Sequence, residues 1–137
     1  MTPPQALLDT DILSAVMRRE RMAVAQSRDY LTVHPQFAIS IITRYEILRG
    51  LSAKRATTQL SGFEALCASM QILPLTDAVI VRAANIYADL YRSGQLIGDA
   101  DILIAATAME YGFVLVTNNE KHHSRIAGLT IENWLRT

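Results

Sequence analysis

Short, wholly apolar runs alternate along this chain with longer segments in which apolar residues recur every three or four positions. The apolar runs predict four strands, at residues 6–9, 37–40, 72–75 and 114–117, with residues 129–131 as a candidate fifth. Runs that are apolar at consecutive positions are typical of strands buried on both faces, as in a parallel sheet. Pro74 lies inside the third run and places that strand at an edge of the sheet, since proline cannot donate a ladder hydrogen bond.

The longer segments predict amphipathic helices between the strands. Their expected ranges are residues 12–17, 22–33, 41–51, 53–69, 77–92 and 99–111. Ser40 and Asp77 are suitable caps for the helices that follow them, and Gly112 is a suitable stop for the last. Strands that alternate with helices predict an α/β fold with a parallel sheet covered on both faces.

Two carboxylates one residue apart open the last predicted helix. Asp99 and Asp101 follow Gly98 and precede the apolar, alanine-rich body of that helix. Side-chain oxygens at this position can cap the free backbone N–H groups. One acid suffices for a cap, however, and two acids this close repel each other unless a cation or a proton intervenes. The pair therefore indicates either a cap or part of a cation site.

Further acidic or amide side chains follow the other predicted strands. Asp9 closes the first strand, Glu46 lies on the helix after the second, and Asn118 and Asn119 follow the fourth. Function gathers at the carboxyl ends of the strands in such sheets, so these side chains are expected to converge. A buried Asp9 requires compensation by a metal ion or by a hydrogen-bonding turn. Glu46 has an ordinary alternative, a weak pair with a basic residue across one helical turn.

Convergent carboxylates favour a hard cation such as Mg²⁺, which prefers oxygen ligands. One or two such ions suit phosphodiester hydrolysis, because a bound metal activates the attacking water. A zinc site is not indicated, because the adjacent His122 and His123 are poorly spaced for binding one ion from a helix. We expect these histidines in an exposed polar loop.

Composition narrows the class of protein. With 137 residues and 50% hydrophobic positions, the chain fits one packed domain, residues 1–137. Its 13 basic and 13 acidic side chains give no general attraction for nucleic acid, although eight of the basic ones fall within residues 1–56. A lone cysteine, Cys67, suits a reducing compartment. No signal peptide or membrane-spanning run is evident, which predicts a cytoplasmic protein.

The ordered set of motifs resembles the PIN-domain family, specifically the VapC-type toxins of bacterial toxin–antitoxin pairs. The matching pieces are Leu7-Leu8-Asp9-Thr10-Asp11 and the segments at residues 39–50, 97–108, 114–119 and 128–135. The resemblance implies a three-layer α/β/α sandwich and a Mg²⁺- or Mn²⁺-dependent endoribonuclease. It also implies an RNA substrate such as tRNA, a homodimer, and a VapB-type antitoxin whose C-terminal segment covers the active site.

The resemblance also assigns site residues. Asp9, Glu46 and Asp101 match the catalytic metal ligands, with Asp99 as a supporting ligand. Supporting polar positions are matched by Thr10, Ser40, Thr117 and Asn119. Two departures stand out: the first motif ends in Asp11 where the family commonly has Asn, and His122-His123 replace an acid followed by Phe.

Two other functions remain open. Asp9-Thr10-Asp11 also resembles the nucleophile and acid pair of haloacid-dehalogenase phosphatases, in which Asp9 would attack phosphorus. The only lysine between the two acidic motifs, Lys54, is poorly placed for that family, and Glu46 would have no role. A catalytically inactive RNA-binding module with the same fold is the second alternative.

Overall fold

The computed structural model describes residues 2–136, so Met1 and Thr137, the ends of the predicted domain, lie outside the described residues. A five-stranded sheet runs through the centre of the molecule in the order β3-β2-β1-β4-β5, and every pairing is parallel. The strands are β1 (Ala6–Leu8), β2 (Ala38–Ser40), β3 (Gln71–Leu73), β4 (Val114–Val116) and β5 (Ile131–Glu132). The predicted α/β fold is confirmed, including the fifth strand and the edge position of the strand before Pro74.

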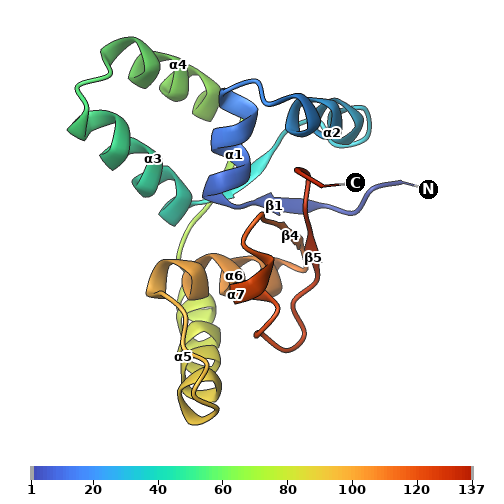
Figure 1. The fold of residues 1–137 in the computed structure, drawn as a ribbon, viewed down its shortest axis with the longest axis vertical. Helices are drawn as coiled ribbons and strands as arrows, with labels where there is room; N and C mark the ends of the chain where they lie inside the picture. Colours follow the sequence, from blue (N-terminus) through green and yellow to red (C-terminus); the bar gives the residue numbers. More distant parts are fainter. Residues whose placement is uncertain (1, 137) are drawn as a thin grey trace.

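Helices cover both faces of this sheet. Within residues 2–136 they are α1 (Thr10–Met17), α2 (Arg21–Leu31), α3 (Ile41–Ala53), α4 (Thr57–Ala68), α5 (Asp77–Arg92), α6 (Asp99–Tyr111) and α7 (Glu120–His123). Figure 1 shows α1 to α4 on one side of the sheet and α5 to α7 on the other. This arrangement confirms the three-layer α/β/α sandwich.

Strand β1 joins the two layers of the core, because its successive side chains point to opposite faces. Leu8 belongs to a cluster with Ile12 and Phe63 on the α1–α4 side. Leu7 belongs to a cluster with Ile104 on the α6 side. All of these side chains are fully buried, which fixes both helical layers against the central strand.

The sequence signals for helix ends were correct at α3 and α6. The predicted cap of α5 and the predicted loop at His122 and His123 were wrong. Ser40 caps α3, its hydroxyl accepting the Ile42 N–H at 3.0 Å, and Gly112 ends α6 with a left-handed φ of 71°. Asp77, however, is the first residue of α5 and not its cap. Thr76 caps that helix, because its hydroxyl accepts the Val79 N–H at 3.2 Å. Helix α7 stands where an exposed polar loop was predicted.

The register of β1 against β4 brings the chain segments that follow these strands together. Leu8 is the partner of Val116, and the Asp9 N–H donates to the Val116 carbonyl at 2.9 Å. Asp9 and Thr117 therefore leave the sheet side by side at its carboxyl edge. None of the helices over residues 2–136 is long and apolar enough to cross a membrane.

Candidate metal centre

Asp9 is a buried carboxylate held by two hydrogen bonds at the end of β1. Only 5% of the residue is exposed. Its Oδ1 accepts the Thr10 N–H at 2.8 Å, and its Oδ2 accepts the Thr117 hydroxyl at 2.7 Å. The hydrogen-bonding turn is therefore present, but it compensates the charge only in part. Burial raises the pKa of Asp9 above its usual range, although the Thr117 hydroxyl acts in the opposite direction.

Asp101 comes to the same place from the first turn of α6. Ligand atoms of Asp9, Asp101 and His123 all lie within 4.8 Å of one another. The cap of α6 is Gly98, and no side chain of the described residues makes a capping hydrogen bond there, so helix capping does not explain the acidic pair. The charge of Asp101 also contributes to the raised pKa of Asp9. Two carboxylates with this mutual repulsion are typical of a site that binds a cation.

His123 is the member of this group that the sequence analysis missed. Its side chain is fully buried in α7, whereas an exposed loop was predicted. Its Nδ1 lies 3.0 Å from the Asn119 carbonyl oxygen. Its Nε2 lies 4.0 Å from Asp101 Oδ1 and has no hydrogen-bond partner among the residues described. The signal that could have found it was a histidine in the position where the family has phenylalanine, a buried residue type.

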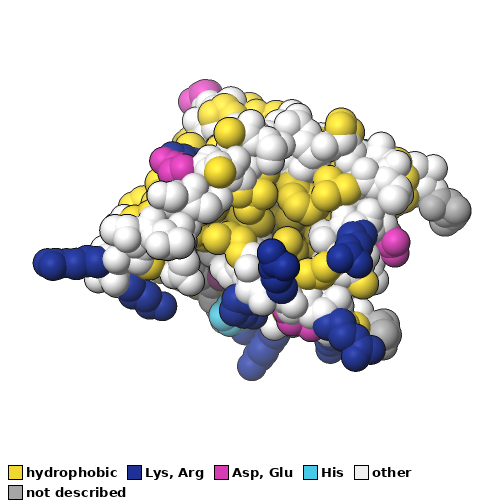
Figure 2. All heavy atoms as spheres, turned by 90° about the horizontal axis from the view of Figure 1, so that it is seen from above, with side chains coloured by type: hydrophobic (Ala, Val, Ile, Leu, Met, Phe, Trp, Pro, Cys, Tyr) yellow, Lys and Arg dark blue, Asp and Glu magenta, His cyan; other side chains and the backbone are white. Residues whose placement is uncertain are grey.

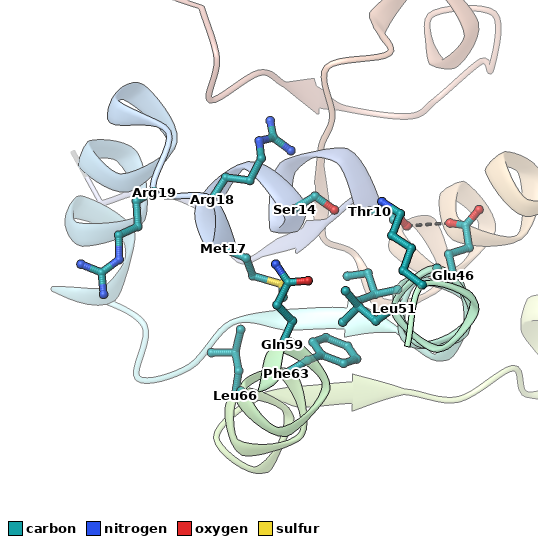
Figure 3. Close-up of a pocket in the computed structure, with 14 residues that line it drawn as sticks. Thr10, Ser14, Met17, Arg18, Arg19, Glu46, Leu51, Gln59, Phe63 and Leu66 are labelled. Carbon is teal, nitrogen blue, oxygen red and sulfur yellow. Dashed lines mark hydrogen bonds between the residues drawn. The ribbon is translucent and has the colours of Figure 1, made fainter. Parts of the chain in front are cut away.

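Glu46 is tied to the start of α1 and stands beside the three-residue group without joining it. Its Oε1 accepts the Thr10 hydroxyl at 2.6 Å, the bond drawn in Figure 3. The Thr10 hydroxyl also lies 3.0 Å from the hydroxyl of the fully buried Thr43. Arg49 lies 3.7 Å from the other carboxylate oxygen, so the expected one-turn pair is present as well. A direct role of Glu46 in metal binding stays a prediction.

The other predicted residues are Thr117, Asn119, Ser40 and Asp99, which differ in burial and in what they contact. Thr117 is buried and contacts Asp9 directly, and its hydroxyl also accepts the Asn119 N–H at 3.0 Å. The Asn119 side chain donates to His122 Nδ1 at 2.9 Å. Ser40 is buried as the cap of α3. Asp99 is exposed and outside the three-residue group, so its supporting role also stays a prediction.

Asp11 is a half-buried carboxylate that follows Asp9 in the first turn of α1. Its Oδ2 accepts the Asn118 N–H at 3.1 Å, and its Oδ1 is buried without a hydrogen-bond partner among the described residues. Burial, followed by the charge of Asp9, raises the pKa of Asp11 from 3.8 to about 6. Ionised Asp11 therefore opposes folding at neutral pH.

We expect Asp11→Asn to stabilise the metal-free protein at pH 7.5 by about 1–2 kcal/mol, after allowance for the partial exposure of Asp11. The amide oxygen keeps the bond to Asn118 while the charge is lost. The native carboxyl holds its proton up to about pH 6, whereas the unfolded chain releases it near 3.8. The stability of the parent therefore falls as pH rises through this window. Urea unfolding with EDTA should show the difference at pH 7.5 and no difference at pH 4; an equal or larger difference at pH 4 would contradict this assignment.

An apolar groove adjoins the site on the α1–α4 side. Figure 2 shows it as an apolar hollow bordered by basic side chains. Its residues come from α1, α3 and α4, and Figure 3 shows several of them: Thr10, Ser14, Met17, Arg18, Arg19, Glu46, Leu51, Gln59, Phe63 and Leu66. Lys54 also lines it. Of the eight early basic residues, Arg18, Arg19 and Lys54 thus border the groove, while Arg44 pairs with Glu64 on α4.

The donor set suits a divalent cation. Asp9 and Asp101 offer carboxylate oxygens, and His123 offers a nitrogen that no hydrogen bond from residues 2–136 uses. Carboxylates suit Mg²⁺ and Mn²⁺, and imidazole suits the transition metals. The buried Asp9 gains most from such an ion, because the ion neutralises a charge that water reaches poorly and that the half-buried Asp101 repels.

Known proteins resemble this chain along most of its length. Residues 6–129 match the PIN domain. Ribonuclease VapC1 of Methanocaldococcus jannaschii is 32% identical over 120 residues, which are 88% of this chain and 79% of that protein. The tRNA(fMet)-specific endonuclease VapC of Salmonella typhimurium is 32% identical over 117 residues, 85% of this chain and 83% of that protein. The crystal structure of VapBC2 from Rickettsia felis bound to a promoter DNA fragment contains a chain of the same fold. Its TM-score is 0.84, with 27% identity over 94% of this chain and 98% of that one.

Proposed function

This chain belongs to the PIN-domain family, and on that premise we propose that it is a metal-dependent endoribonuclease, the toxin of a toxin–antitoxin pair. The observation that carries the proposal is the group of Asp9, Asp101 and His123 at the carboxyl edge of the sheet. The family match and the hydrogen bonds that hold Asp9 argue against the phosphatase alternative, in which Asp9 would have to be free to attack phosphorus.

In the proposed mechanism, Asp9 and Asp101 bind the cation, assisted by Glu46, Asp99 and Asn119. A cation held there would supply an activated water for attack on an RNA phosphodiester. Thr117 orients Asp9 by donating to its Oδ2. Thr10 orients Glu46 in the same way, through a hydroxyl that donates to Oε1. Such outer contacts fix the direction of a ligand and its affinity for the ion.

The proposal is tested by cleavage of total cellular RNA with purified protein in Mg²⁺, in Mn²⁺ and in EDTA. Discrete fragments in the metal lanes and intact RNA in EDTA would support it. Preparations must be free of any bound antitoxin, which mass spectrometry can establish. Binding of metal and RNA without cleavage in any lane would instead support the inactive module.

Removing the metal is expected to lower the stability of the folded protein. A cation that binds only the native state stabilises it by about 2.7 kcal/mol at one hundred times its dissociation constant. The melting temperature should therefore rise with added Mn²⁺ and return to its starting value with excess EDTA. Thermal unfolding followed by circular dichroism measures this. A melting temperature insensitive to Mn²⁺ and Mg²⁺ would contradict a metal centre at Asp9 and Asp101.

We propose that single-stranded loops of a structured RNA, such as tRNA, are the substrate. Unpaired loops expose their bases and backbone to an enzyme, whereas the grooves of an RNA helix restrict access. One relative is named as a tRNA(fMet)-specific endonuclease, which supports tRNA as the first RNA to test. The lone buried Cys67 agrees with a reducing cytoplasm as the site of action.

We propose a VapB-type antitoxin as the inhibitory partner, bound in the groove between α1, α3 and α4. The groove has an apolar floor that includes Met17, Leu51 and Phe63, and Arg18 and Lys54 border it. This suits an amphipathic protein segment with acidic residues better than it suits RNA. Thr10 and Glu46 line the groove as well, so its occupant would reach the catalytic site.

A homodimer is also proposed, supported by exposed apolar side chains on α5: Ile80, Val81, Tyr87 and Tyr91.

A further inference from the structure

We propose that His123 binds the catalytic metal directly through Nε2, so that the centre is a mixed carboxylate–imidazole site and prefers Mn²⁺ to Mg²⁺. This inference rests on the proposed metal-dependent function and deepens it. The family resemblance gives no precedent, because it implies carboxylate ligands and an acid followed by Phe where this chain has His122 and His123.

The position of the ring carries the inference. His123 is fully buried, and a ring nitrogen of it and carboxylate oxygens of Asp9 and Asp101 all lie within 4.8 Å of one another. Its Nε2 lies 4.0 Å from Asp101 Oδ1. No hydrogen bond within the described residues uses this nitrogen. A buried polar atom without a partner carries a desolvation cost, so such atoms point to an unseen water or ion. Here the ligand must also suit two carboxylates, which selects a cation.

The other ring nitrogen decides which tautomer faces the site. His123 Nδ1 lies 3.0 Å from the Asn119 carbonyl oxygen. A carbonyl oxygen only accepts hydrogen bonds, so Nδ1 carries the proton and donates it. In the neutral ring the lone pair is then on Nε2, the nitrogen that lies 4.0 Å from Asp101 Oδ1. Metal-binding histidines are usually oriented in this manner, with the second nitrogen donating to a backbone carbonyl.

The competing explanation is a doubly protonated ring that neutralises the two acids without a metal. In that case Nε2–H would be expected to form a close hydrogen bond to a carboxylate oxygen. The distance from His123 Nε2 to the carboxylate oxygen Asp101 Oδ1 is 4.0 Å, which is beyond hydrogen-bond range. The three ligand atoms lie within 4.8 Å of one another without a hydrogen bond between Nε2 and Asp101, a spacing that a shared ion would bridge.

The metal preference follows from the ligand type. Carboxylate, carbonyl and water ligands suit Mg²⁺, whereas imidazole favours transition metals. Exchanging an all-oxygen set for one that includes imidazole should therefore favour Mn²⁺ over Mg²⁺. Replacing His123 with Phe restores the residue that the family often has and removes the nitrogen, so this preference should weaken in His123→Phe.

The test is direct detection of histidine nitrogen at bound Mn²⁺ by electron spin echo spectroscopy on the full chain. Wild-type protein should show coupling to a histidine nitrogen, and isotope labelling of the histidines should change that coupling. His123→Phe and His123→Gln should lose it and bind Mn²⁺ about tenfold or more weakly by calorimetry. The matched control is His34→Gln, which removes the third histidine of the chain, a ring whose Nε2 lies 2.7 Å from the Pro3 carbonyl oxygen, and should keep both the coupling and the affinity. His122→Gln removes the neighbouring ring, whose Nδ1 lies 3.8 Å from Asp101 Oδ2, and should keep the coupling.

Each contrary outcome has its own meaning. Tight Mn²⁺ binding without nitrogen coupling in wild type would overturn the imidazole ligand and leave the proposed nuclease intact. Coupling that disappears in His122→Gln and persists in His123→Phe would overturn the assignment to His123. Tighter Mn²⁺ binding in His123→Phe would favour the protonated ring and overturn the inference. No binding of Mn²⁺ or Mg²⁺ to wild type would overturn both the ligand and the metal-dependent nuclease. The wild-type labelling experiment decides whether a histidine binds the metal even where a variant fails to fold, and the comparison of His123→Gln with His122→Gln assigns the ring.

Discussion

Asp101→Asn is expected to abolish RNA cleavage, with a loss of about 10³-fold or more in rate, while the protein stays folded. The amide has nearly the same shape as the carboxylate but lacks the charge that binds a cation. Loss of a metal-activated water removes several kcal/mol of transition-state stabilisation, and each 1.36 kcal/mol is about tenfold in rate. The measurement is single-turnover cleavage of a defined RNA in saturating Mn²⁺.

Stability provides the control for this variant. The charge of Asp101 helps to raise the pKa of Asp9, so Asp101→Asn relieves a repulsion. Its unfolding free energy in EDTA should equal or exceed that of the parent, which separates lost chemistry from lost folding. Asp77→Asn is a matched substitution of an exposed acid in the first turn of α5 and should cleave normally. Full cleavage by Asp101→Asn would remove Asp101 from the mechanism.

Thr117→Val should have the second largest effect, a loss of about 10- to 100-fold in metal affinity. The substitution keeps the shape and removes the hydroxyl that donates to Asp9 Oδ2 at 2.7 Å. That donor lowers the pKa of Asp9, so without it the pKa rises further. An Asp9 that holds its proton more tightly must be ionised at higher pH before it binds the metal. The acidic limb of the cleavage profile should therefore move to higher pH.

The measurement is the pH dependence of cleavage and of Mn²⁺ affinity for parent and variant. Thr107→Val is the matched control, because Thr107 is also fully buried but donates to the Leu103 carbonyl within its own helix. It should leave the profile in place. A Thr117→Val profile that coincides with that of the parent would show that the hydroxyl does not act through Asp9.

The fold was predictable because most signals were local. Apolar runs of consecutive residues marked buried parallel strands, and Gly112 marked the end of α6 by its left-handed conformation. Pro74 marked the edge strand. The cap of α5 was misassigned because Thr76 and Asp77 are both good cap residues, and only the backbone geometry selects Thr76.

The candidate site was predictable where residues directly follow strands. Asp9 and Thr117 follow neighbouring parallel strands, so the register alone brings them together. Asp101 joins them because α6 begins at the same edge of the sheet. Glu46 was placed less accurately, since sequence spacing does not show that the Thr10 hydroxyl holds its carboxylate.

His123 was beyond the reach of local signals. Its burial depends on how α7 packs after β4, which no spacing rule for neighbouring histidines reveals. The expectation that adjacent histidines are poorly spaced for binding one ion is consistent with the structure, in which His123 belongs to the group with Asp9 and Asp101 and His122 does not. The error was to treat both histidines as a single exposed unit.

The most direct test of the central claim is the chemistry of the cleaved ends. A defined RNA is cut by the protein with Mn²⁺ in water labelled with the heavy oxygen isotope, and the products are analysed by mass spectrometry. Attack by a metal-activated water places one solvent oxygen on the new terminal phosphate and forms no cyclic phosphate. The same products should be absent with Asp101→Asn. A 2′,3′-cyclic phosphate product, or labelled ends that persist with Asp101→Asn, would contradict hydrolysis at this metal centre.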